Sequence, residues 1–331
     1  MIDLSDIARQ LVAPGKGLLA ADESTASADK RLIQYGITPS VEARRKYRDL
    51  FLATPGIEAY ISGVILYQET LDQAADDGTP FPELLASRGI IPGIKVDEGT
   101  EPFPESKDEL ITKGLIGLPE RLQKFSRYGT GFTKWRAVIR IKGDMLPTGT
   151  ALLENAKRLA QYARDVQQAG MVPILEPEVL LEGPHSRVRS REVLVKTLET
   201  LMATLQDHAV DFSGIILKTA MAVSGSESGR TDSPEEVAED TLAALLETVP
   251  SSVPGIVFLS GGQTPDQATE NLRAISRKAR EVHAPWPLTF SYARAIQGEA
   301  LTVWGGNDEA IPQAREAYLE RLKKVADALG A

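Results

Sequence analysis

The sequence has no cysteine and only three histidines among its 331 residues. The absence of cysteine excludes disulfide bonds, cysteine-ligated zinc and thiol nucleophiles. The histidines, His185, His208 and His283, lie far apart in the sequence, and none has a second histidine four residues away. A zinc site built mainly of histidines would need all three to converge in the fold, so the sequence predicts no metal centre.

Long apolar runs and basic clusters are also missing. No run approaches the roughly 20 apolar residues that span a bilayer. The net charge of −9, without a basic stripe, argues against nucleic acid as a partner, although a few local cations could still bind a small anion. Residues Met1–Arg9 carry two aspartates and no basic cluster, which is typical of neither a signal nor a transit peptide, so we expect a cytoplasmic protein.

Short apolar runs rich in β-branched residues alternate with longer amphipathic stretches, and no sequence repeat stands out. Several of these runs are nearly continuously apolar, as parallel strands buried on both faces are. The expected strands are Gly17–Ala21, Ile61–Leu66, Ile91–Val96, Ala137–Ile141, Val172–Leu175, Gly214–Leu217, Gly255–Leu259 and Leu288–Phe290. A polar or charged residue sits at or just past the end of most of them.

The stretches between these runs predict helices. Residues 150–168 place apolar side chains at spacings of three and four, which makes one apolar stripe. Ser233 and Thr264 are each followed by proline, with a glutamate or glutamine three residues on, which is a helix-start signal. A last helix is expected over Ile311–Leu329.

Eight strands with crossover helices fit either a (β/α)₈ barrel or an open doubly wound sheet. A nucleotide-binding open sheet needs a glycine-rich turn after its first strand, but residues 19–25 contain no glycine. We therefore predict a single-domain α/β protein, a (β/α)₈ TIM barrel over residues 1–331. The stretches Glu101–Glu105 and Ser224–Ser233 are expected to be loops at the ligand-binding end, and Ser224–Arg230 is a candidate mobile lid.

Lys218 follows the buried run Ile215–Leu217, so it lies at the inner end of a strand. A lysine there must have its charge satisfied or lose its proton. The free amine could attack a ketone, and the resulting iminium would stabilise a carbanion on the adjacent carbon. The alternative is a structural ion pair with a carboxylate of a neighbouring strand.

Glu176 and Glu178 flank Pro177 at the end of another expected strand. Forming and dehydrating a carbinolamine needs a group that gives and takes protons, and a partly buried carboxylate with a raised pKa suits that role. The alternative is that both carboxylates neutralise nearby lysines, and the two interpretations are compatible.

Cations also end expected strands or lie near them. If they face one mouth of the barrel, they would form a positive ring suited to a substrate with two phosphates. These cations are Lys30, Arg31, Lys95, Lys134, Arg136 and Arg294. Solvated side chains are the simpler alternative. Spacing alone does not choose Lys134, because Lys142 would lie nearer the mouth if the strand ran to Ile141.

Ser260, Gly261 and Gly262 follow what we count as the seventh strand. Glycines let backbone N–H groups approach an oxyanion, the serine hydroxyl adds a donor, and turns after strands seven and eight of such barrels often bind phosphate. Most such triplets are plain turns, so the signal is weak alone.

Ten sequence strings together resemble class I fructose-1,6-bisphosphate aldolase. They occur in the family's order and cover most of the chain. The strings are Leu18–Thr25 (LLAADEST), Gly63–Glu69 (GVILYQE), Asp76–Pro82 (DDGTPFP), Gly93–Asp97 (GIKVD), Lys134–Val138 (KWRAV), Val172–Glu178 (VPILEPE), Leu217–Lys218 (LK), Phe258–Gln263 (FLSGGQ), Leu288–Ala295 (LTFSYARA) and Trp304–Gly306 (WGG).

The resemblance implies reversible cleavage of fructose 1,6-bisphosphate to dihydroxyacetone phosphate and glyceraldehyde 3-phosphate, in glycolysis or gluconeogenesis, without metal or cofactor. It implies Lys218 as the Schiff-base lysine, Glu176 as the main acid and base, and Asp22 at the C4 hydroxyl. It also implies Lys134, not Lys142, beside the reacting carbons, with Glu178 supporting the lysines. The implied residues for the ketone-side phosphate are Ser260, Gly261, Gly262, Ser291 and Arg294, and those for the remote end are Ser24, Ser27, Arg31, Lys95 and Arg136. Family members are commonly homo-tetramers.

The sequence departs from the animal pattern in three places. Thr219-Ala220-Met221 stands where Pro-Asn-Met follows the lysine, and Ala293 stands in place of a glycine. The printed sequence also lacks the family's C-terminal tail with its terminal tyrosine, and its last tyrosine, Tyr318, falls in an expected helix. We therefore expect another group to exchange the proton on the ketone half, or that step to be slow.

Three rival functions remain at this stage. A metal-dependent aldolase or isomerase needs a histidine and carboxylate site that this sequence can barely supply. A Schiff-base aldolase for tagatose or sedoheptulose bisphosphate, or for fructose 1-phosphate, would carry the same motifs. A barrel that only binds a protein partner would not need the lysine and carboxylate positions.

Overall fold

The short buried runs form parallel strands that close into an eight-stranded barrel in the computed structural model, which describes residues 3–330. The barrel strands are β1 (Gly17–Ala21), β2 (Ile61–Leu66), β3 (Ile91–Lys95), β6 (Phe132–Ile139), β7 (Val172–Val179), β8 (Ile216–Thr219), β9 (Ile256–Phe258) and β10 (Leu288–Tyr292). Each pairs in parallel with its chain-order neighbour in the barrel, and β10 pairs with β1 to close the ring. The predicted (β/α)₈ fold is confirmed, and β9 and β10 are the seventh and eighth barrel strands.

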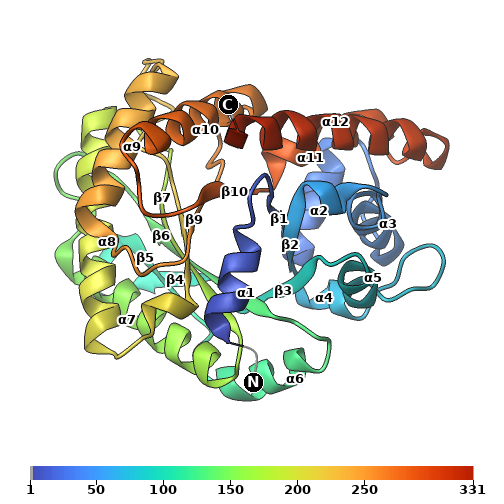
Figure 1. Cartoon of the computed structure of the whole chain (residues 1–331), viewed down its shortest axis with the longest axis horizontal. Coiled ribbons are helices and arrows are strands. Elements are labelled where there is room, and N and C mark those ends of the chain that lie inside the picture. The colour runs from blue at the N-terminus through green and yellow to red at the C-terminus, as the bar shows by residue number, and fades with distance from the viewer. Residues whose placement is uncertain (1–2, 331) are drawn as a thin grey trace.

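Helices surround these strands (Figure 1). They are α1 (Leu4–Leu11), α2 (Thr25–Gln34), α3 (Val41–Leu52), α4 (Gln68–Leu71), α5 (Phe81–Ser87), α6 (Leu118–Ser126), α7 (Gly149–Gln168), α8 (Arg187–Asp207), α9 (Pro234–Thr248), α10 (Pro265–Glu281), α11 (Arg294–Trp304) and α12 (Ile311–Gly330). Ser233 and Thr264 cap α9 and α10, each in a capping box with the residue three positions on, as their sequences predict. None of the helices in residues 3–330 is long and apolar enough to cross a membrane.

Helix α1, which precedes the first strand, was not predicted, although Asp3 caps it and Leu4, Ala8 and Leu11 recur at helical spacing. Its Ala8 and Leu11 pack with the inward-facing side chains of the barrel, among them Leu18 of β1 and Phe132 of β6. Figure 1 shows this helix at the centre of the view, in front of the strands. The barrel is thus filled by apolar side chains at its N-terminal end, which leaves the other end for polar groups. Lys30 and Arg31, expected on the first helix, therefore lie on the second, α2.

Two strand predictions missed a bound by four or more residues, and the strand expected over Gly214–Leu217 runs instead over Ile216–Thr219, so Lys218 lies inside it. The strand expected over Ala137–Ile141 begins five residues earlier and includes Lys134 and Arg136, and the strand expected to end at Leu175 runs on to Val179. A charged residue in the sequence predicts a strand end, because an unpaired charge is costly in a sheet. Here the cations of β6 meet the carboxylates of β7 directly, so the charges do not end either strand.

The region 100–112 was also misjudged. Glu101–Glu105 was expected to be a loop, but β4 (Thr100–Phe103) and β5 (Ser106–Thr112) form an antiparallel hairpin outside the barrel. The Thr112 hydroxyl donates to the Arg136 carbonyl at 2.8 Å, which ties the hairpin to β6. Prolines and glutamates are rare in buried strands, so the largely exposed strand β4 was not predicted.

The packing of the barrel interior around Gly93 of β3 can be tested by substitution. A Cβ atom there would overlap the ring of Phe132, which is fully buried. Gly93→Ala should lower the free energy of unfolding by about 1–3 kcal/mol, as overpacking does. Denaturant unfolding would measure this change. The matched control is Gly149→Ala at the start of α7, where a Cβ meets no atom within 4 Å. An equal effect of the two substitutions would contradict the packing argument.

Candidate active site

Glu176 lies between two lysine amines at the C-terminal mouth of the barrel. Its Oε1 atom is 3.1 Å from Nζ of Lys218, and its Oε2 atom is 3.1 Å from Nζ of Lys134. Lys134 also reaches Asp22, with 2.6 Å between Nζ and Oδ2. Glu176, Lys134 and Lys218 are buried, each with no more than 4% of its surface exposed. Two carboxylates and two lysines therefore form one ionic cluster, in the order Asp22, Lys134, Glu176, Lys218.

The strand geometry explains why these residues meet. Side chains two residues apart on a strand point to the same face, so Lys134 shares a face with Arg136, and Glu176 with Glu178. The register places Arg136 opposite Glu176 and Leu217 opposite Leu175, so Lys218 on β8 lies level with Glu176 on β7. Asp22 follows directly on β1. The four residues that the resemblance places around the reacting carbons therefore lie together, with Lys134, Glu176 and Lys218 inside their strands rather than past the strand ends.

The charges of the cluster are strongly coupled. Burial would raise the pKa of Asp22, but Lys134 and Lys218 lower it to about 2. Burial would lower the pKa of Lys134, but Asp22 and Glu176 raise it above its ordinary value, so this lysine stays charged. Lys142, the alternative to Lys134, lies outside the cluster and pairs with Asp108 at 2.7 Å, with about half of each side chain exposed.

The expected raised pKa of Glu176 was wrong. Burial does act in that direction, but Lys134 and Lys218, with Arg136, outweigh it and lower the pKa of Glu176. The sequence indicated the burial of this carboxylate but not how many cations face it. Glu176 is therefore ionised at neutral pH, and it can act as an acid only after it takes a proton from a neighbour.

A cavity of about 650 Å³ opens beside the cluster. Asp22 and Lys134 line it together with the expected remote-end residues Ser24, Ser27, Lys95 and Arg136. The cations of this group are not free: Lys95 Nζ is 2.6 Å from Asp97 Oδ1, and Arg136 pairs with Glu178. A phosphate in this cavity would compete with these carboxylates, because two cations of the expected positive ring, Lys95 and Arg136, are already paired.

The remaining remote-end residues lie on α2. Ser24 caps this helix, and its hydroxyl donates to the Ser27 hydroxyl at 3.1 Å. Arg31 is half-buried further along the helix and does not line the cavity, whereas Lys30 is exposed. The structure therefore brings Ser24 and Ser27 to the site and leaves Arg31 at its edge.

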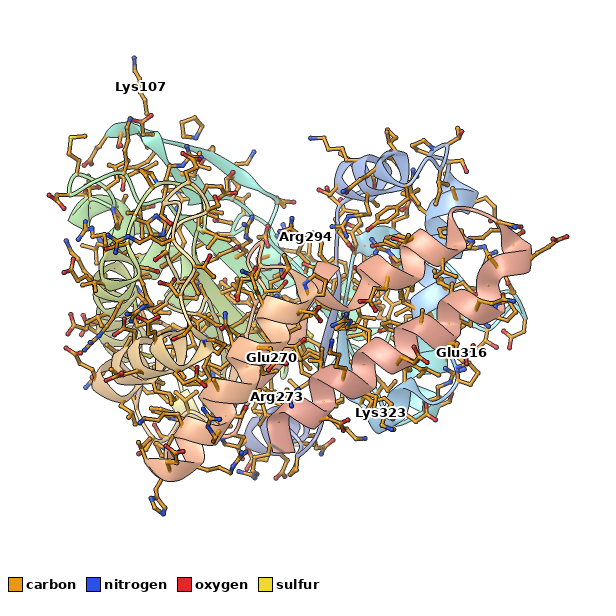
Figure 2. The ribbon with its side chains drawn as sticks, turned by 90° about the horizontal axis from the view of Figure 1, so that it is seen from above. Lys107, Glu270, Arg273, Arg294, Glu316 and Lys323 are labelled. Atoms are coloured by element: carbon orange, nitrogen blue, oxygen red, sulfur yellow. The ribbon has the colours of Figure 1, made fainter. Side chains whose placement is uncertain are left out.

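The expected ketone-side phosphate residues follow β9 and β10, except Ser291, which lies inside β10. Ser260 and Ser291 are buried, and the hydroxyl of Ser291 has no hydrogen-bond partner among residues 3–330. Gly261 and Gly262 both have positive φ, of 52° and 92°, which only glycine adopts easily. Arg294 begins α11, and Figure 2 shows it near the middle of the molecule, whereas Lys107 projects from the periphery. A Cβ on Gly262 would be 3.9 Å from the Arg294 guanidinium, so turn and arginine adjoin.

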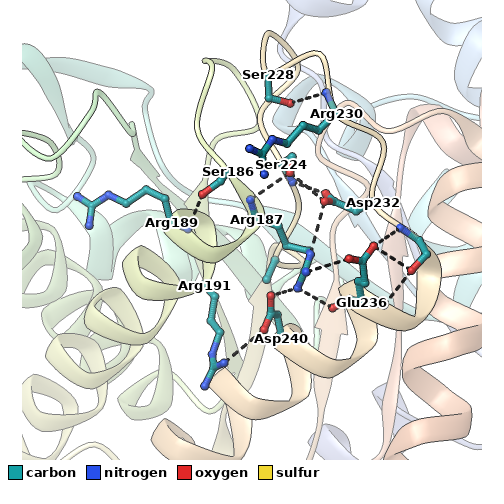
Figure 3. Close-up of polar contacts among 12 residues, drawn as sticks. Ser186, Arg187, Arg189, Arg191, Ser224, Ser228, Arg230, Asp232, Glu236 and Asp240 are labelled. Carbon is teal, nitrogen blue, oxygen red and sulfur yellow. Dashed lines mark hydrogen bonds and ion pairs between the residues drawn. The ribbon is translucent and has the colours of Figure 1, made fainter.

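The candidate lid, Ser224–Arg230, is bonded to the start of α8 (Figure 3). The Ser224 N–H donates to Asp232 at 2.6 Å, and its hydroxyl accepts from the Arg187 N–H at 3.0 Å. Arg187 also pairs with Asp232 and Asp240. The N–H groups of residues 225–227 donate to carbonyls in the segment 181–185. The lid stays a prediction, and its opening would have to break these bonds.

Sequence reasoning missed two residues that support the site. Asp97 follows β3 and holds Lys95, and the rule that polar residues follow strand ends could have found it. Glu23 lies beside Asp22, is mostly buried and also lines the cavity. Its partner Arg48 lies in a run of charged residues on α3, where no pattern marks one arginine as buried.

A buried lysine and carboxylate cluster at the C-terminal mouth defines an enzyme of the (β/α)₈ barrel class. Comparison with known proteins gives the family. The model of the class I fructose-bisphosphate aldolases matches residues 3–330. The chain is 45% identical to a probable class 1 fructose-bisphosphate aldolase of Xanthomonas axonopodis pv. citri, over 97% of this chain and 95% of that one. It is 46% identical to the cytosolic fructose-bisphosphate aldolase 6 of Arabidopsis thaliana, over 96% and 88% of the two chains.

A solved structure agrees with these sequence matches. The fructose-bisphosphate aldolase of Plasmodium falciparum, in a complex with TRAP and a small-molecule inhibitor, superposes with a TM-score of 0.96 at 41% identity, covering 98% of this chain and 93% of that one. The chain belongs to the class I fructose-bisphosphate aldolase family. Its activity is the reversible, metal-independent aldol cleavage of fructose 1,6-bisphosphate through a lysine Schiff base.

The cluster predicts a pH-dependent stability. The pKa of Asp22 falls from 3.8 to about 2 on folding, so its contribution is present above pH 4 and lost as the pH falls toward 2. The full contribution is about 2 kcal/mol, of which about 1 kcal/mol is lost between pH 5 and pH 3. Asp22→Asn should therefore be less stable than the wild type at pH 6, and its stability should fall less steeply with acid. Chemical denaturation at a series of pH values measures both, and parallel pH curves would contradict the prediction.

Proposed function

We propose that Lys218 is the amine that forms the Schiff base. The observation that supports this is the buried contact of Lys218 with Glu176, in which the ammonium lies 3.1 Å from a carboxylate that can take its proton. Lys218 passes one proton to Glu176 and attacks the C2 ketone, forming a carbinolamine. The protonated Glu176 then returns that proton to the departing hydroxyl, and water leaves as the iminium forms.

Carbon–carbon cleavage follows on the other side of the cluster. Asp22, with Glu176 close by, accepts the proton of the C4 hydroxyl while the C3–C4 bond breaks. The electron pair of that bond moves to the iminium, which becomes a neutral enamine, and glyceraldehyde 3-phosphate leaves. Lys134 stays charged throughout and stabilises the oxygen on which negative charge develops. Protonation at C3 and hydrolysis release dihydroxyacetone phosphate. Tyr318 has no part in this, because it is buried in α12 against Phe51.

We assign the two phosphates to opposite sides of the cluster. Ser260, Gly261, Gly262, Ser291 and Arg294 would hold the phosphate next to the ketone, where positive-φ glycines expose N–H groups beside an arginine. Lys95 and Arg136, with Ser24, Ser27 and Arg31, would hold the remote phosphate. Phosphate binding there would release Asp97 and Glu178 from Lys95 and Arg136, which would free Glu178 for its expected support of the lysines.

The molecular assembly and location are proposals as well. We propose a homo-oligomer, a tetramer by family resemblance, which sedimentation would reveal as a multiple of the 35.9 kDa chain mass. We also propose a cytoplasmic location, which the cytosolic plant relative supports.

The Schiff base is tested by trapping. We expect dihydroxyacetone phosphate followed by borohydride to modify Lys218 alone, because Lys134 is held charged between two carboxylates. Peptide mapping by mass spectrometry identifies the site. Lys218→Met should abolish the label and lower kcat by several orders of magnitude. A label on another lysine, or an active Lys218→Met enzyme, would overturn the assignment.

The remote phosphate site is tested by comparing two sugars. Lys95→Met should lower kcat/KM for fructose 1,6-bisphosphate by about 10- to 100-fold, the usual loss for a charged hydrogen bond. Fructose 1-phosphate lacks the remote phosphate, so its kcat/KM should hardly change. Lys107→Met, at an exposed lysine, is the control. Equal losses of kcat/KM for both sugars would show that Lys95 does not bind the remote phosphate.

A further inference from the structure

Two consecutive residues of α3 hold the glutamate beside Asp22. Arg48 donates to Glu23 Oε2 at 2.6 Å and to the Glu23 main-chain carbonyl at 3.0 Å. The Tyr47 hydroxyl donates to Glu23 Oε1 at 2.8 Å. Three bonds therefore fix both the backbone and the side chain of the residue that follows Asp22.

Stability alone does not explain this arrangement. Tyr47 is 0% exposed and Arg48 3%, and Glu23 is the carboxylate that pairs with Arg48 among residues 3–330. Apolar residues of similar volume often serve as well as a buried ion pair, because desolvating the two charges offsets much of their attraction. Because Arg48 also binds the main-chain carbonyl of Glu23, the pair fixes the backbone position of the turn after β1.

The same network reaches the phosphate side. The Gln297 amide oxygen is 3.3 Å from the Tyr47 hydroxyl, and Gln297 lies three residues after Arg294 on α11. Burial raises the pKa of Tyr47 well above its usual range, with Glu23 adding to the effect, so the hydroxyl keeps its proton. The turn after β1 is thus tied to α3, and the Tyr47 hydroxyl, which donates its one proton to Glu23, lies beside the helix that begins with Arg294.

We propose that Arg48 and Tyr47 are positioning residues that aim Asp22 at the C4 hydroxyl during bond cleavage. The inference rests on the role proposed for Asp22. Within residues 3–330, the Asp22 carboxylate pairs with Lys134 and has no other ion pair or side-chain hydrogen bond to hold it. Its direction is therefore set by the turn, and Glu23 is the point at which the turn is held.

The proposal separates two steps of the reaction. Dihydroxyacetone phosphate has no C4, so its Schiff base with Lys218 forms without the contact that Asp22 makes. A variant with a displaced Asp22 should still be trapped by borohydride, but should cleave the bisphosphate slowly. A residue needed only for folding would lower both in proportion to the folded fraction.

The test uses Tyr47→Phe and Arg48→Lys, with Tyr318→Phe as the matched control. Tyr47 and Tyr318 are both fully buried and both pack edge-on against Phe51, but the Tyr318 hydroxyl has no partner within residues 3–330. We expect kcat for fructose 1,6-bisphosphate to fall about 10-fold in Tyr47→Phe and about 100-fold in Arg48→Lys, as small misplacements of reacting groups do. KM and the trapped fraction of Lys218 should stay within about twofold of the wild type, and Tyr318→Phe should keep full activity.

Each outcome bears on one claim. A Tyr47→Phe enzyme no slower than Tyr318→Phe overturns the positioning role, as does a trapped fraction that falls together with kcat. If Arg48→Lys fails to fold, Tyr47→Phe still decides, because the phenyl ring and its packing are kept. Absence of label on Lys218 in the wild-type enzyme would instead overturn the proposed function, and this inference with it.

Discussion

The contact of one carboxylate with two buried lysines governs the rest of the site. Glu176 lies 3.1 Å from both Lys134 and Lys218, and Asp22 balances the second positive charge. Removing any member would leave an unpaired charge in the barrel mouth, which costs several kcal/mol. The cluster can therefore exist only when four strands deliver their side chains to the same level. It also supplies a short path by which Lys218 can give up the proton that prevents it from attacking a ketone.

The two ends of the barrel have different roles: one is a packed apolar core, and the other carries the charged cluster. Apolar side chains of the strands, joined by Ala8 and Leu11 of α1, fill the N-terminal end and make it rigid. The charged residues lie at the other end, where β6 and β7 run further than the neighbouring strands and carry two charges each on one face. Elements outside the barrel then hold the turns, as Arg48 does for Glu23 and Arg187 does for the 224–232 loop.

Much of this could be predicted from the sequence. Apolar runs ended by charged residues gave the barrel, and motif resemblance gave Lys218, Glu176, Lys134 and Asp22. What failed depended on partners distant in sequence. Lys134 and Arg136 were wrongly predicted to precede a strand, because the carboxylates that neutralise them lie far away in the sequence, on β7 and just after β1. The prediction for the pKa of Glu176 was wrong for the same reason. The neighbouring sequence indicates that the carboxylate is buried, but it does not indicate which lysines and arginines from other strands face it.

The central claim is that Glu176 takes the Lys218 proton before the amine attacks. The most direct measurement is the rate of Schiff-base formation with dihydroxyacetone phosphate, followed by rapid borohydride quenching in Glu176→Gln. Glu182→Gln, at an exposed glutamate just after β7, is the control. We expect a rate about 10²- to 10⁴-fold slower in Glu176→Gln, the usual contribution of a positioned acid and base, and no change in the control. An unchanged rate in Glu176→Gln would contradict the claim.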